Sequence, residues 1–253
     1  MNNMKFIAII PARYASTRFP GKPLAMLCGT TVIQRVYNQV SKAVDNVLVA
    51  TDDERILNHV KSFGGKAVMT STEHRSGTDR CWEAYNLNQG KEDIIINVQG
   101  DEPFIQPEQI KAIMQCFDDK NTQIATLVKP FNKDGSFSIL ENPNNVKVVI
   151  DSDMNALYFS RSVIPCLRGI DKSIWPSHHQ YYTHLGMYAY RAETLNKITQ
   201  LKQSQLEIAE SLEQLRWLEN GLRINVGITN QSSIGIDTPE DLAKAEQFLS
   251  SKT

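Results

Sequence analysis

Short apolar runs alternate with helical patterns through the first half of the chain, and this alternation limits the possible folds more than any other feature. Runs that are apolar throughout are typical of strands buried on both faces, and apolar residues at three- and four-residue spacing are typical of helices. The alternation predicts an α/β fold with a mostly parallel sheet and helices on both faces. The expected strands span residues 6–11, 47–50, 67–69, 94–98 and 124–128, and helical patterns cover residues 32–40, 56–63, 80–88 and 107–117.

The pattern changes after about residue 129. Residues 146–150, 156–160 and 185–191 are predicted strands that follow one another without helices, and residues 165–182 are predicted to form a loop. Helical patterns return at residues 207–220 and 239–249. No flexible linker precedes the strand-rich part. We therefore expect a single domain over residues 1–253, with a β-rich lobe inserted at roughly residues 130–191.

Composition excludes several classes of protein. The 253 residues carry a formal net charge of −1, which argues against broad contact with nucleic acid or an acidic membrane. The four cysteines form no CxxC pair, so neither a zinc site nor a redox dithiol is indicated. We expect reduced thiols in a cytoplasmic protein. We also expect no signal peptide and no membrane helix, because no apolar run reaches the required ~20 residues.

The strongest motif directly follows the first predicted strand. The segment PARYASTRFPGKPL, residues 11–24, combines the cations Arg13, Arg18 and Lys22 with the hydroxyls of Ser16 and Thr17. Cations and backbone N–H groups in one loop are what a triphosphate requires. The segment matches neither the dinucleotide GxGxxG motif nor the GxxxxGK[ST] P-loop. A basic surface loop is the alternative, but the position after a buried strand favours phosphate binding.

Two carboxylates are predicted at the ends of strands, where Mg²⁺ is commonly held together with substrate phosphates. Asp101 follows the fourth strand, in the segment QGDEP. The segment Gly235–Asp237 is predicted to end a short strand before the last helix. We expect Thr238 to cap that helix together with Asp241, which leaves Asp237 available. An acidic turn and an ordinary helix start are the alternatives.

These motifs resemble those of the bacterial 3-deoxy-manno-octulosonate (Kdo) cytidylyltransferases, within the wider superfamily of sugar nucleotidyltransferases. The likeness covers nearly the whole chain. Besides residues 11–24, it rests on HRSGTDR at residues 74–80, NVQGDEP at 97–103, LYFSR at 157–161, HLG at 184–186, LEQLR at 212–216 and GIDTPED at 235–241.

The resemblance implies a three-layer fold of the nucleotide-diphospho-sugar transferase type. It implies an enzyme that activates Kdo with CTP and Mg²⁺, giving CMP-Kdo and pyrophosphate for lipopolysaccharide biosynthesis, and that forms a homodimer through the β-rich lobe. The catalytic residues would be Arg13, Arg18, Lys22 and Asp101, and the metal ligands Asp101 and Asp237. Nucleotide-binding residues would be Pro11, Ala12, Arg13, Ser16, Thr17, Lys22, Arg75, Ser76, Gly77, Thr78 and Gln99. Sugar-binding residues would be Arg161, His184, Tyr188, Glu213 and Gln214.

Some alternatives stay open from the sequence. Ser76 and Thr78 suit helix capping as well as base recognition, and Asp53 is expected to be a helix N-cap. Gln205 stands where the family usually has proline, and Met187 replaces its usual isoleucine. Both departures border the expected sugar pocket, so 8-amino-Kdo or a sialic acid is an alternative substrate. A glycosyltransferase and a non-catalytic nucleotide sensor are more distant alternatives, since the chain lacks an Asp-x-Asp motif at Asp101 and carries both metal carboxylates.

Overall fold

The computed structural model of the chain describes residues 4–231 and 235–250. The described residues form two compact units. The first comprises residues 4–111, 189–199 and 235–250, and the second comprises residues 112–188 and 200–231. Residues 1–3, where we expect no targeting segment, lie outside this description.

Four parallel strands form the centre of the first unit. They are β1 (Phe6–Ala12), β4 (Val47–Thr51), β5 (Ala67–Met69) and β6 (Ile94–Asn97), in the spatial order β6-β1-β4-β5. Every residue of β4 and β6 is buried, as expected of strands covered on both faces. The predicted strands are confirmed here to within two residues.

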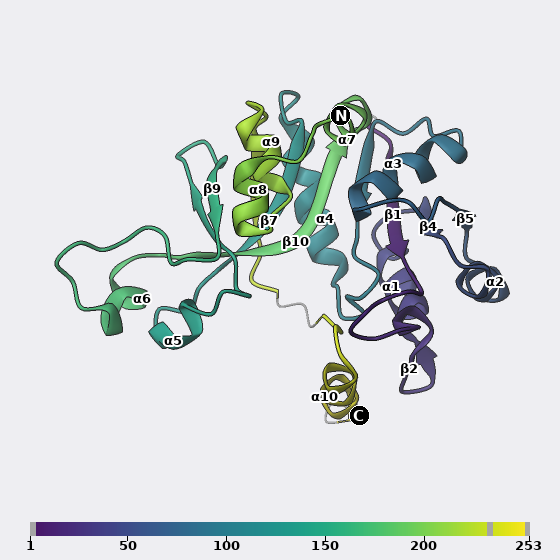
Figure 1. Cartoon of the computed structure of the whole chain (residues 1–253), viewed down its shortest axis with the longest axis horizontal. Coiled ribbons are helices and arrows are strands. Elements are labelled where there is room, and N and C mark those ends of the chain that lie inside the picture. The colour runs from purple at the N-terminus through teal and green to yellow at the C-terminus, as the bar shows by residue number, and fades with distance from the viewer. Residues whose placement is uncertain (1–3, 232–234, 251–253) are drawn as a thin grey trace. The chain divides into compact units, whose positions relative to one another are not determined.

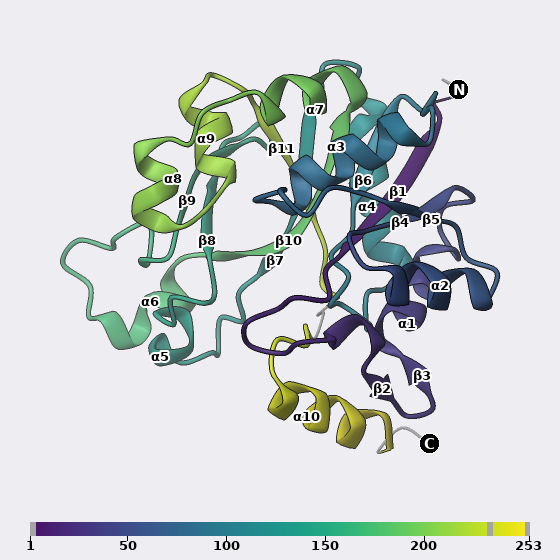
Figure 2. The same ribbon diagram turned by 45° about the vertical axis from the view of Figure 1, so that its right-hand side comes forward.

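Helices cover both faces of these strands. The chain runs from β1 through α1 (Val32–Val40) to β4, through α2 (Glu54–Ser62) to β5, and back through α3 (Gly77–Leu87) to β6 on the other side of β1. Because such crossovers are right-handed, α1 and α2 lie on one face and α3 on the other. Figure 2 shows α3 in front of the strands, and α3 packs on β1, β4 and β6. The α/β fold class with its three layers is confirmed.

The strand order reverses beside β1, with β4 on one side and β6 on the other. In open parallel sheets such a reversal leaves a crevice at the carboxyl ends of the strands, where ligands bind. The loops after β1 and β6 are therefore the place to look for a site. Other elements of this unit are η1 (Lys22–Leu24), the β2–β3 hairpin (Met26–Leu27, Thr30–Thr31), α7 (Ala192–Thr199) and α10 (Pro239–Ser250), with α4 (Pro107–Gln115) at its boundary.

The second unit combines a parallel pair with an antiparallel group. Strand β7 (Ile124–Pro130) pairs in parallel with β11 (Ile224–Ile228). Strand β8 (Lys147–Ile150) pairs antiparallel with β9 (Ala156–Ser160) and with the start of β10 (Tyr182–Arg191), a strand whose last three residues belong to the first unit. The predicted strands of this region are confirmed, and Figure 1 shows β9 beside α8 and α9. The remaining helical turns are η2 (Cys116–Asp118), α5 (Phe137–Leu140), η3 (Lys172–Ile174) and α6 (Trp175–His178).

Three local predictions are wrong. The helix expected at residues 207–220 is two helices, α8 (Gln205–Glu210) and α9 (Gln214–Glu219), because Ser211 between them adopts the left-handed conformation at φ 51°. The expected loop at residues 165–182 contains η3 and α6. Residues 235–237 form no strand, although the Ile236 N–H donates to the Asp101 carbonyl at 2.8 Å. Among the described residues, no helix is long and apolar enough to cross a membrane.

Candidate active site

The phosphate loop, defined here as residues 13–22, leaves the carboxyl end of β1 and folds back on itself. The Tyr14 carbonyl accepts hydrogen bonds from the N–H groups of Ser16 at 3.0 Å and Gly21 at 2.9 Å. Gly21 adopts φ +73°, a conformation that glycine takes without steric cost. A Cβ at this position would also lie 3.1 Å from the Tyr14 ring. The shape of the loop therefore depends on glycine at position 21.

The Tyr14 ring is held from outside the loop. The guanidinium carbon of Arg55 lies 3.3 Å from the Tyr14 ring centroid, which is a cation–π contact. Arg55 donates two side-chain hydrogen bonds to the Asp53 carboxylate, at 2.9 and 2.6 Å. These bonds lower the pKa of Asp53, which also accepts from the Arg55 N–H as the N-cap of α2. The N-cap prediction for Asp53 is confirmed.

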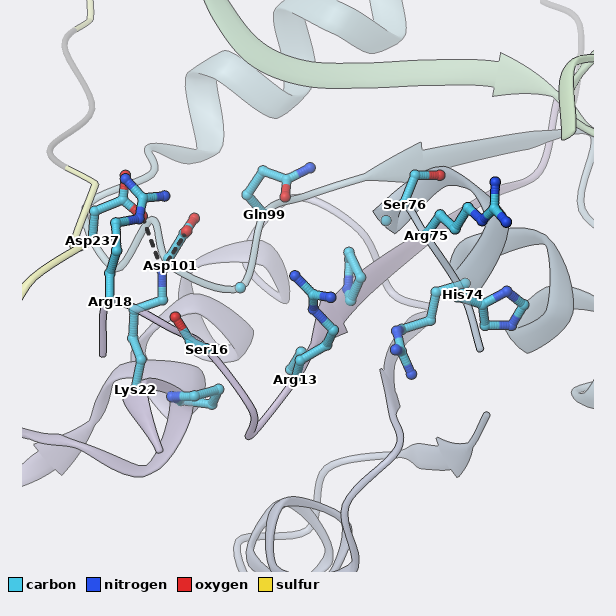
Figure 3. A pocket seen from close by; sticks show the side chains of 16 residues that line it. Arg13, Ser16, Arg18, Lys22, His74, Arg75, Ser76, Gln99, Asp101 and Asp237 are labelled. Atoms are coloured by element: carbon cyan, nitrogen blue, oxygen red, sulfur yellow. Dashed lines mark hydrogen bonds and ion pairs between the residues drawn. The ribbon is translucent and has the colours of Figure 1, made fainter. Parts of the chain in front are cut away.

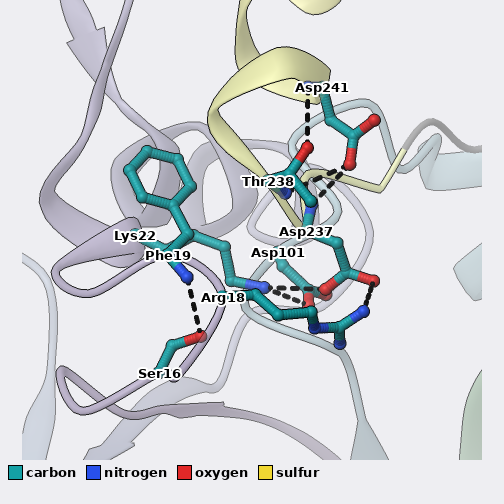
Figure 4. A network of polar contacts seen from close by, with 8 residues as sticks. All are labelled: Ser16, Arg18, Phe19, Lys22, Asp101, Asp237, Thr238 and Asp241. Atoms are coloured by element: carbon teal, nitrogen blue, oxygen red, sulfur yellow. Dashed lines mark hydrogen bonds and ion pairs between the residues drawn. The ribbon is translucent and has the colours of Figure 1, made fainter.

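Two carboxylates and two cations meet beside the phosphate loop (Figure 4). The Lys22 ammonium donates to Asp101 Oδ2 at 2.8 Å and to Asp237 Oδ1 at 3.2 Å. Arg18 Nη1 lies 3.2 Å from Asp237 Oδ2. Both carboxylates thus converge on one nitrogen atom, although they come from distant parts of the sequence.

Local capping leaves the Asp237 carboxylate available for these contacts. The Asp241 N–H donates to the Thr238 hydroxyl at 3.2 Å, and the Thr238 N–H donates to the Asp241 carboxylate at 3.1 Å. This reciprocal pair satisfies N–H groups at the start of α10 without the Asp237 side chain. The predicted capping role of Thr238 is confirmed.

One pocket of about 220 Å³ contains most of the predicted nucleotide residues (Figure 3). It opens at the carboxyl ends of β1 and β6 and belongs wholly to the first unit. Its lining residues are Pro11, Ala12, Arg13, Ser16, Arg18, Lys22, Pro23, His74, Arg75, Ser76, Gly77, Arg80, Gln99, Gly100, Asp101 and Asp237.

Two glycines let the pocket walls approach closely. A Cβ on Gly100 would lie 2.8 Å from the Pro11 carbonyl oxygen, closer than a real carbon approaches. A Cβ on Gly77 would lie 3.3 Å from the Pro11 ring. Ser76, next to Gly77, caps α3 by accepting from the Asp79 N–H at 3.1 Å and also lines the pocket. Both roles considered for Ser76 are therefore compatible.

Two predicted nucleotide residues do not line the pocket. Thr17 lies in the phosphate loop but its side chain is exposed. Thr78 is buried within α3, because the first turn of that helix packs against the sheet. Their predicted contacts with nucleotide have no support from the pocket geometry.

Arg80 and His74 line the pocket, although neither residue was predicted to belong to the site. Arg80 is only 1% exposed, and it donates to Thr70 at 2.6 Å and to Asp52 at 2.7 Å. His74 contacts Glu83 at 2.5 Å, and Glu83 also accepts from the Ser71 N–H. The motif HRSGTDR contains both residues, but their partners Asp52 and Glu83 lie outside it. The motif therefore gave no sign of these ion pairs.

The predicted sugar residues all belong to the second unit. The His184 ring lies 5.2 Å from the Tyr188 ring, and the Tyr188 ring lies 5.0 Å from that of Trp217. Gln214 is 4% exposed, and its buried Nε2 has no hydrogen-bond partner among the described residues. A buried amide N–H without a hydrogen-bond partner costs free energy. A ligand hydroxyl that accepts a hydrogen bond from Gln214 Nε2 would remove that cost and so bind favourably.

Arg161 and Glu213 are already engaged within the second unit. The Arg161 side chain donates to the carbonyls of Glu210, Pro143 and Ser211, at 2.7, 3.0 and 3.2 Å. Glu213 accepts from Arg216 at 2.7 Å. Arg161 therefore links two backbone segments, at residue 143 and at residues 210–211, to the end of β9.

The carboxylate pair fits a divalent cation bound together with phosphate. The oxygens of Asp101 and Asp237 that converge on the Lys22 ammonium show that one cation can contact both residues. The described residues hold no cluster of three or more His, Cys, Asp or Glu side chains suited to a metal. Mg²⁺ is commonly held by one or two carboxylates plus substrate phosphates, which matches this donor set.

Most of the chain matches the model of a known protein family. The family model for cytidylyltransferases matches residues 7–224. The chain belongs to the cytidylyltransferase family. That match spans nearly all of β1, the phosphate loop and every strand from β2 to β10, and it ends at the first residue of β11.

Individual cytidylyltransferases match over their full length. The 3-deoxy-manno-octulosonate cytidylyltransferase of Bacteroides thetaiotaomicron is 62% identical over 250 residues, covering 99% of this chain and 100% of that protein. The enzyme of the same name from Parabacteroides distasonis is 63% identical, covering 98% of this chain and 100% of that protein. The solved structure of CMP:2-keto-3-deoxy-manno-octonic acid synthetase complexed with CTP matches with a TM-score of 0.90 at 40% identity, over 98% of this chain and 100% of that chain.

Proposed function

We propose that the chain is a CTP-dependent cytidylyltransferase that converts Kdo into CMP-Kdo. In this reaction the anomeric hydroxyl of the sugar attacks the α-phosphorus of CTP, a new P–O bond forms, and pyrophosphate leaves. The observation that carries the proposal is one pocket at the strand reversal, where Arg13, Arg18 and Lys22 lie with Asp101 and Asp237. The full-length likeness to 3-deoxy-manno-octulosonate cytidylyltransferases supports the choice of substrates.

The three cations of the phosphate loop would offset the charge of the triphosphate. In phosphoryl transfer, negative charge grows on the leaving pyrophosphate, so fixed cations stabilise the transition state more than the bound substrate. Arg18 is the most exposed of the two cations that contact Asp237, with 67% of its side chain accessible. We therefore expect the exposed Arg18 side chain to adjust to the phosphates more freely than the largely buried Lys22 side chain.

Mg²⁺ held by Asp101 and Asp237 would polarise the phosphoryl oxygens and lower the pKa of the attacking hydroxyl. The protein's own contribution is to hold two carboxylates on one point at the carboxyl edge of the sheet. The hydrogen bond from the Ile236 N–H to the Asp101 carbonyl fixes the two carboxylate segments to each other.

The base and the sugar would be recognised in different ways. Ser76, Gly77 and Gln99 line the end of the pocket beside α3, where polar groups and backbone can distinguish cytosine from uracil. We propose that the buried Gln214 and the partly buried His184 of the second unit bind sugar hydroxyls. The unpartnered Nε2 of Gln214 supports this assignment.

The substrate can be tested directly by measuring pyrophosphate release. Each nucleoside triphosphate is incubated with Mg²⁺ and, in separate reactions, with Kdo, 8-amino-Kdo, a sialic acid or no sugar. We expect release with CTP and Kdo only. Faster release with 8-amino-Kdo would move the assignment to the amino sugar, consistent with the departures at Met187 and Gln205. No release with any acidic sugar would contradict the proposed activity.

We also propose that the enzyme acts as a homodimer in the cytoplasm and supplies lipopolysaccharide biosynthesis. The support is the resemblance of the chain to the bacterial Kdo enzymes, together with its net charge of −1 and its cysteines, which form no disulfide bonds. Light scattering of the purified protein should give twice the 28.6 kDa mass of one chain. A mass of one chain at micromolar concentration would contradict the dimer.

A further inference from the structure

The Lys22 ammonium occupies the point at which the two predicted metal carboxylates converge. It lies 2.8 Å from Asp101 Oδ2 and 3.2 Å from Asp237 Oδ1, and only 12% of its side chain is exposed. Figure 4 shows the Lys22 side chain reaching between the two carboxylates. Arg18 meets Asp237 on its other oxygen and is mostly exposed. Lys22 is thus the cation that both carboxylates share.

A divalent cation that bridges the two carboxylates would occupy the point at which they converge. Mg²⁺ binds carboxylate oxygens at about 2.0–2.1 Å in near-octahedral geometry, which leaves no room for an ammonium group at the same point. The charges work in the same direction. Two carboxylates are balanced by Lys22 and Arg18, so a bare cation meets a site with little net negative charge. Metal binding therefore requires that Lys22 first release the carboxylates.

We propose that Lys22 prevents a bare divalent cation from binding at Asp101 and Asp237, and that the nucleotide's phosphates draw the ammonium away. Metal and nucleotide then bind interdependently, because the triphosphate supplies both the new partner for Lys22 and further ligands for the metal. This inference rests on the proposed metal role of the two carboxylates. It adds a second role for Lys22, which decides when the metal binds as well as stabilising the leaving group.

The pocket offers a matched control for this role. Arg13 lines the same pocket and carries the same charge. In residues 4–231 and 235–250, the ion pairs recorded for the two carboxylates involve Lys22 and Arg18 and not Arg13. Removing Arg13 therefore changes the pocket's charge without freeing either carboxylate.

Equilibrium dialysis with Mn²⁺ as the probe measures metal retained by the protein without CTP. We expect Lys22→Met to bind Mn²⁺ at least about tenfold more tightly than the wild type, the scale of losing one close competing charge near the surface. Lys22→Arg, which keeps a cation, and Arg13→Met should each stay within about threefold of the wild type. Adding Asp101→Asn to Lys22→Met should abolish the gain. A gain in binding does not arise from misfolding, and thermal melting checks each variant.

The inference is overturned if Lys22→Met binds Mn²⁺ no more tightly than Arg13→Met does. Retention of Mn²⁺ in the presence of CTP separates this result from failure of the proposed function. If the wild type retains Mn²⁺ with CTP and Asp101→Asn does not, the carboxylates bind metal and only the role of Lys22 is wrong. If Asp101→Asn retains Mn²⁺ with CTP as the wild type does, the metal assignment itself fails.

Discussion

Asp101 and Asp237 are the residues on which the proposed chemistry depends most. We expect Asp101→Ala and Asp237→Ala each to lower turnover by at least ~100-fold, the usual scale for losing a preorganised electrostatic contact in an active site. Both side chains are partly exposed, at 30% and 47%, so the fold should survive. Steady-state kinetics at saturating Mg²⁺ measures the effect.

Asp134→Ala is the control, because Asp134 is an exposed carboxylate of the second unit. It should keep wild-type turnover. Near-normal turnover of Asp101→Ala or of Asp237→Ala would mean that the substituted residue is not a metal ligand.

His184 is predicted to be a neutral hydrogen-bond donor. Desolvation lowers the pKa of His184 to about 3. The Thr126 hydroxyl donates to the Met187 carbonyl at 2.8 Å, so at 2.9 Å it accepts from His184 Nε2. The ring therefore carries its proton on Nε2 and packs between aromatic neighbours without charge.

This neutral histidine makes stability depend on pH. Its folded pKa lies below the unfolded value of about 6.5, so its contribution is present above pH 6.5 and is lost as the pH falls toward 3. Between pH 7.5 and 4.5 the wild type should lose about 2–3 kcal/mol more unfolding free energy than His184→Gln. Urea denaturation at both pH values measures this difference. Equal losses would mean that His184 is not held neutral.

At the scale of elements, the conformation of the phosphate loop depends on a residue of helix α2. Arg55 of α2 covers the Tyr14 ring, which in turn packs on Gly21. A cation–π contact at an exposed site is worth about 0.5–1 kcal/mol, or roughly two- to fivefold in affinity. We expect Arg55→Ala to raise the KM for CTP by that factor, with kcat nearly unchanged.

Arg55→Lys should restore most of the CTP affinity, because it keeps a cation over the ring. The melting temperature should change little in either variant, since the Asp53 carboxylate still accepts a hydrogen bond from the backbone N–H of residue 55. A fall in kcat without a change in KM would show that Arg55 does not act through the loop's ground-state shape.

Element boundaries followed from local signals where those signals were present. Gly64 at φ +82°, Asp53 as N-cap and the Thr238–Asp241 pair lie next to the helix ends that they define. The break between α8 and α9 had no such signal. Ser211 is not a residue that favours the left-handed region, and the neighbouring apolar spacing is continuous across it.

At the scale of the whole molecule, the predicted nucleotide and sugar residues divide between the two units. We therefore expect their substitutions to have separable effects. Gln214→Ala should raise the activation free energy of sugar-dependent turnover by roughly 1–3 kcal/mol, because the buried sugar hydroxyls would lose their hydrogen-bond partner. Calorimetry should show CTP binding unchanged.

Ser76→Ala provides the opposite case, since Ser76 lines the pocket of the first unit that we propose binds CTP. It should weaken CTP binding. Equal losses of CTP affinity in both variants would mean that Gln214 serves the nucleotide or the fold, and its assignment to the sugar would fail.

The sequence by itself determined the α/β class, the parallel strands and the phosphate loop. Buried strands appear as unbroken apolar runs, and a loop of cations and glycine after the first strand has few other uses. These features depend on residues close together in the chain. The same holds for Asp101 and Asp237 as separate candidates, each placed beside a strand or helix by its own short motif.

Only the tertiary structure decided which of these residues meet. Lys22 bonds Asp237 across 215 positions of sequence, and the buried Arg80 bonds Asp52 across 28. No local pattern encodes such contacts, because they depend on strand order and on the reversal beside β1. The tertiary fold likewise brings the Lys22 ammonium between two carboxylates. The proposed competition between Lys22 and a metal therefore depends on the folded chain.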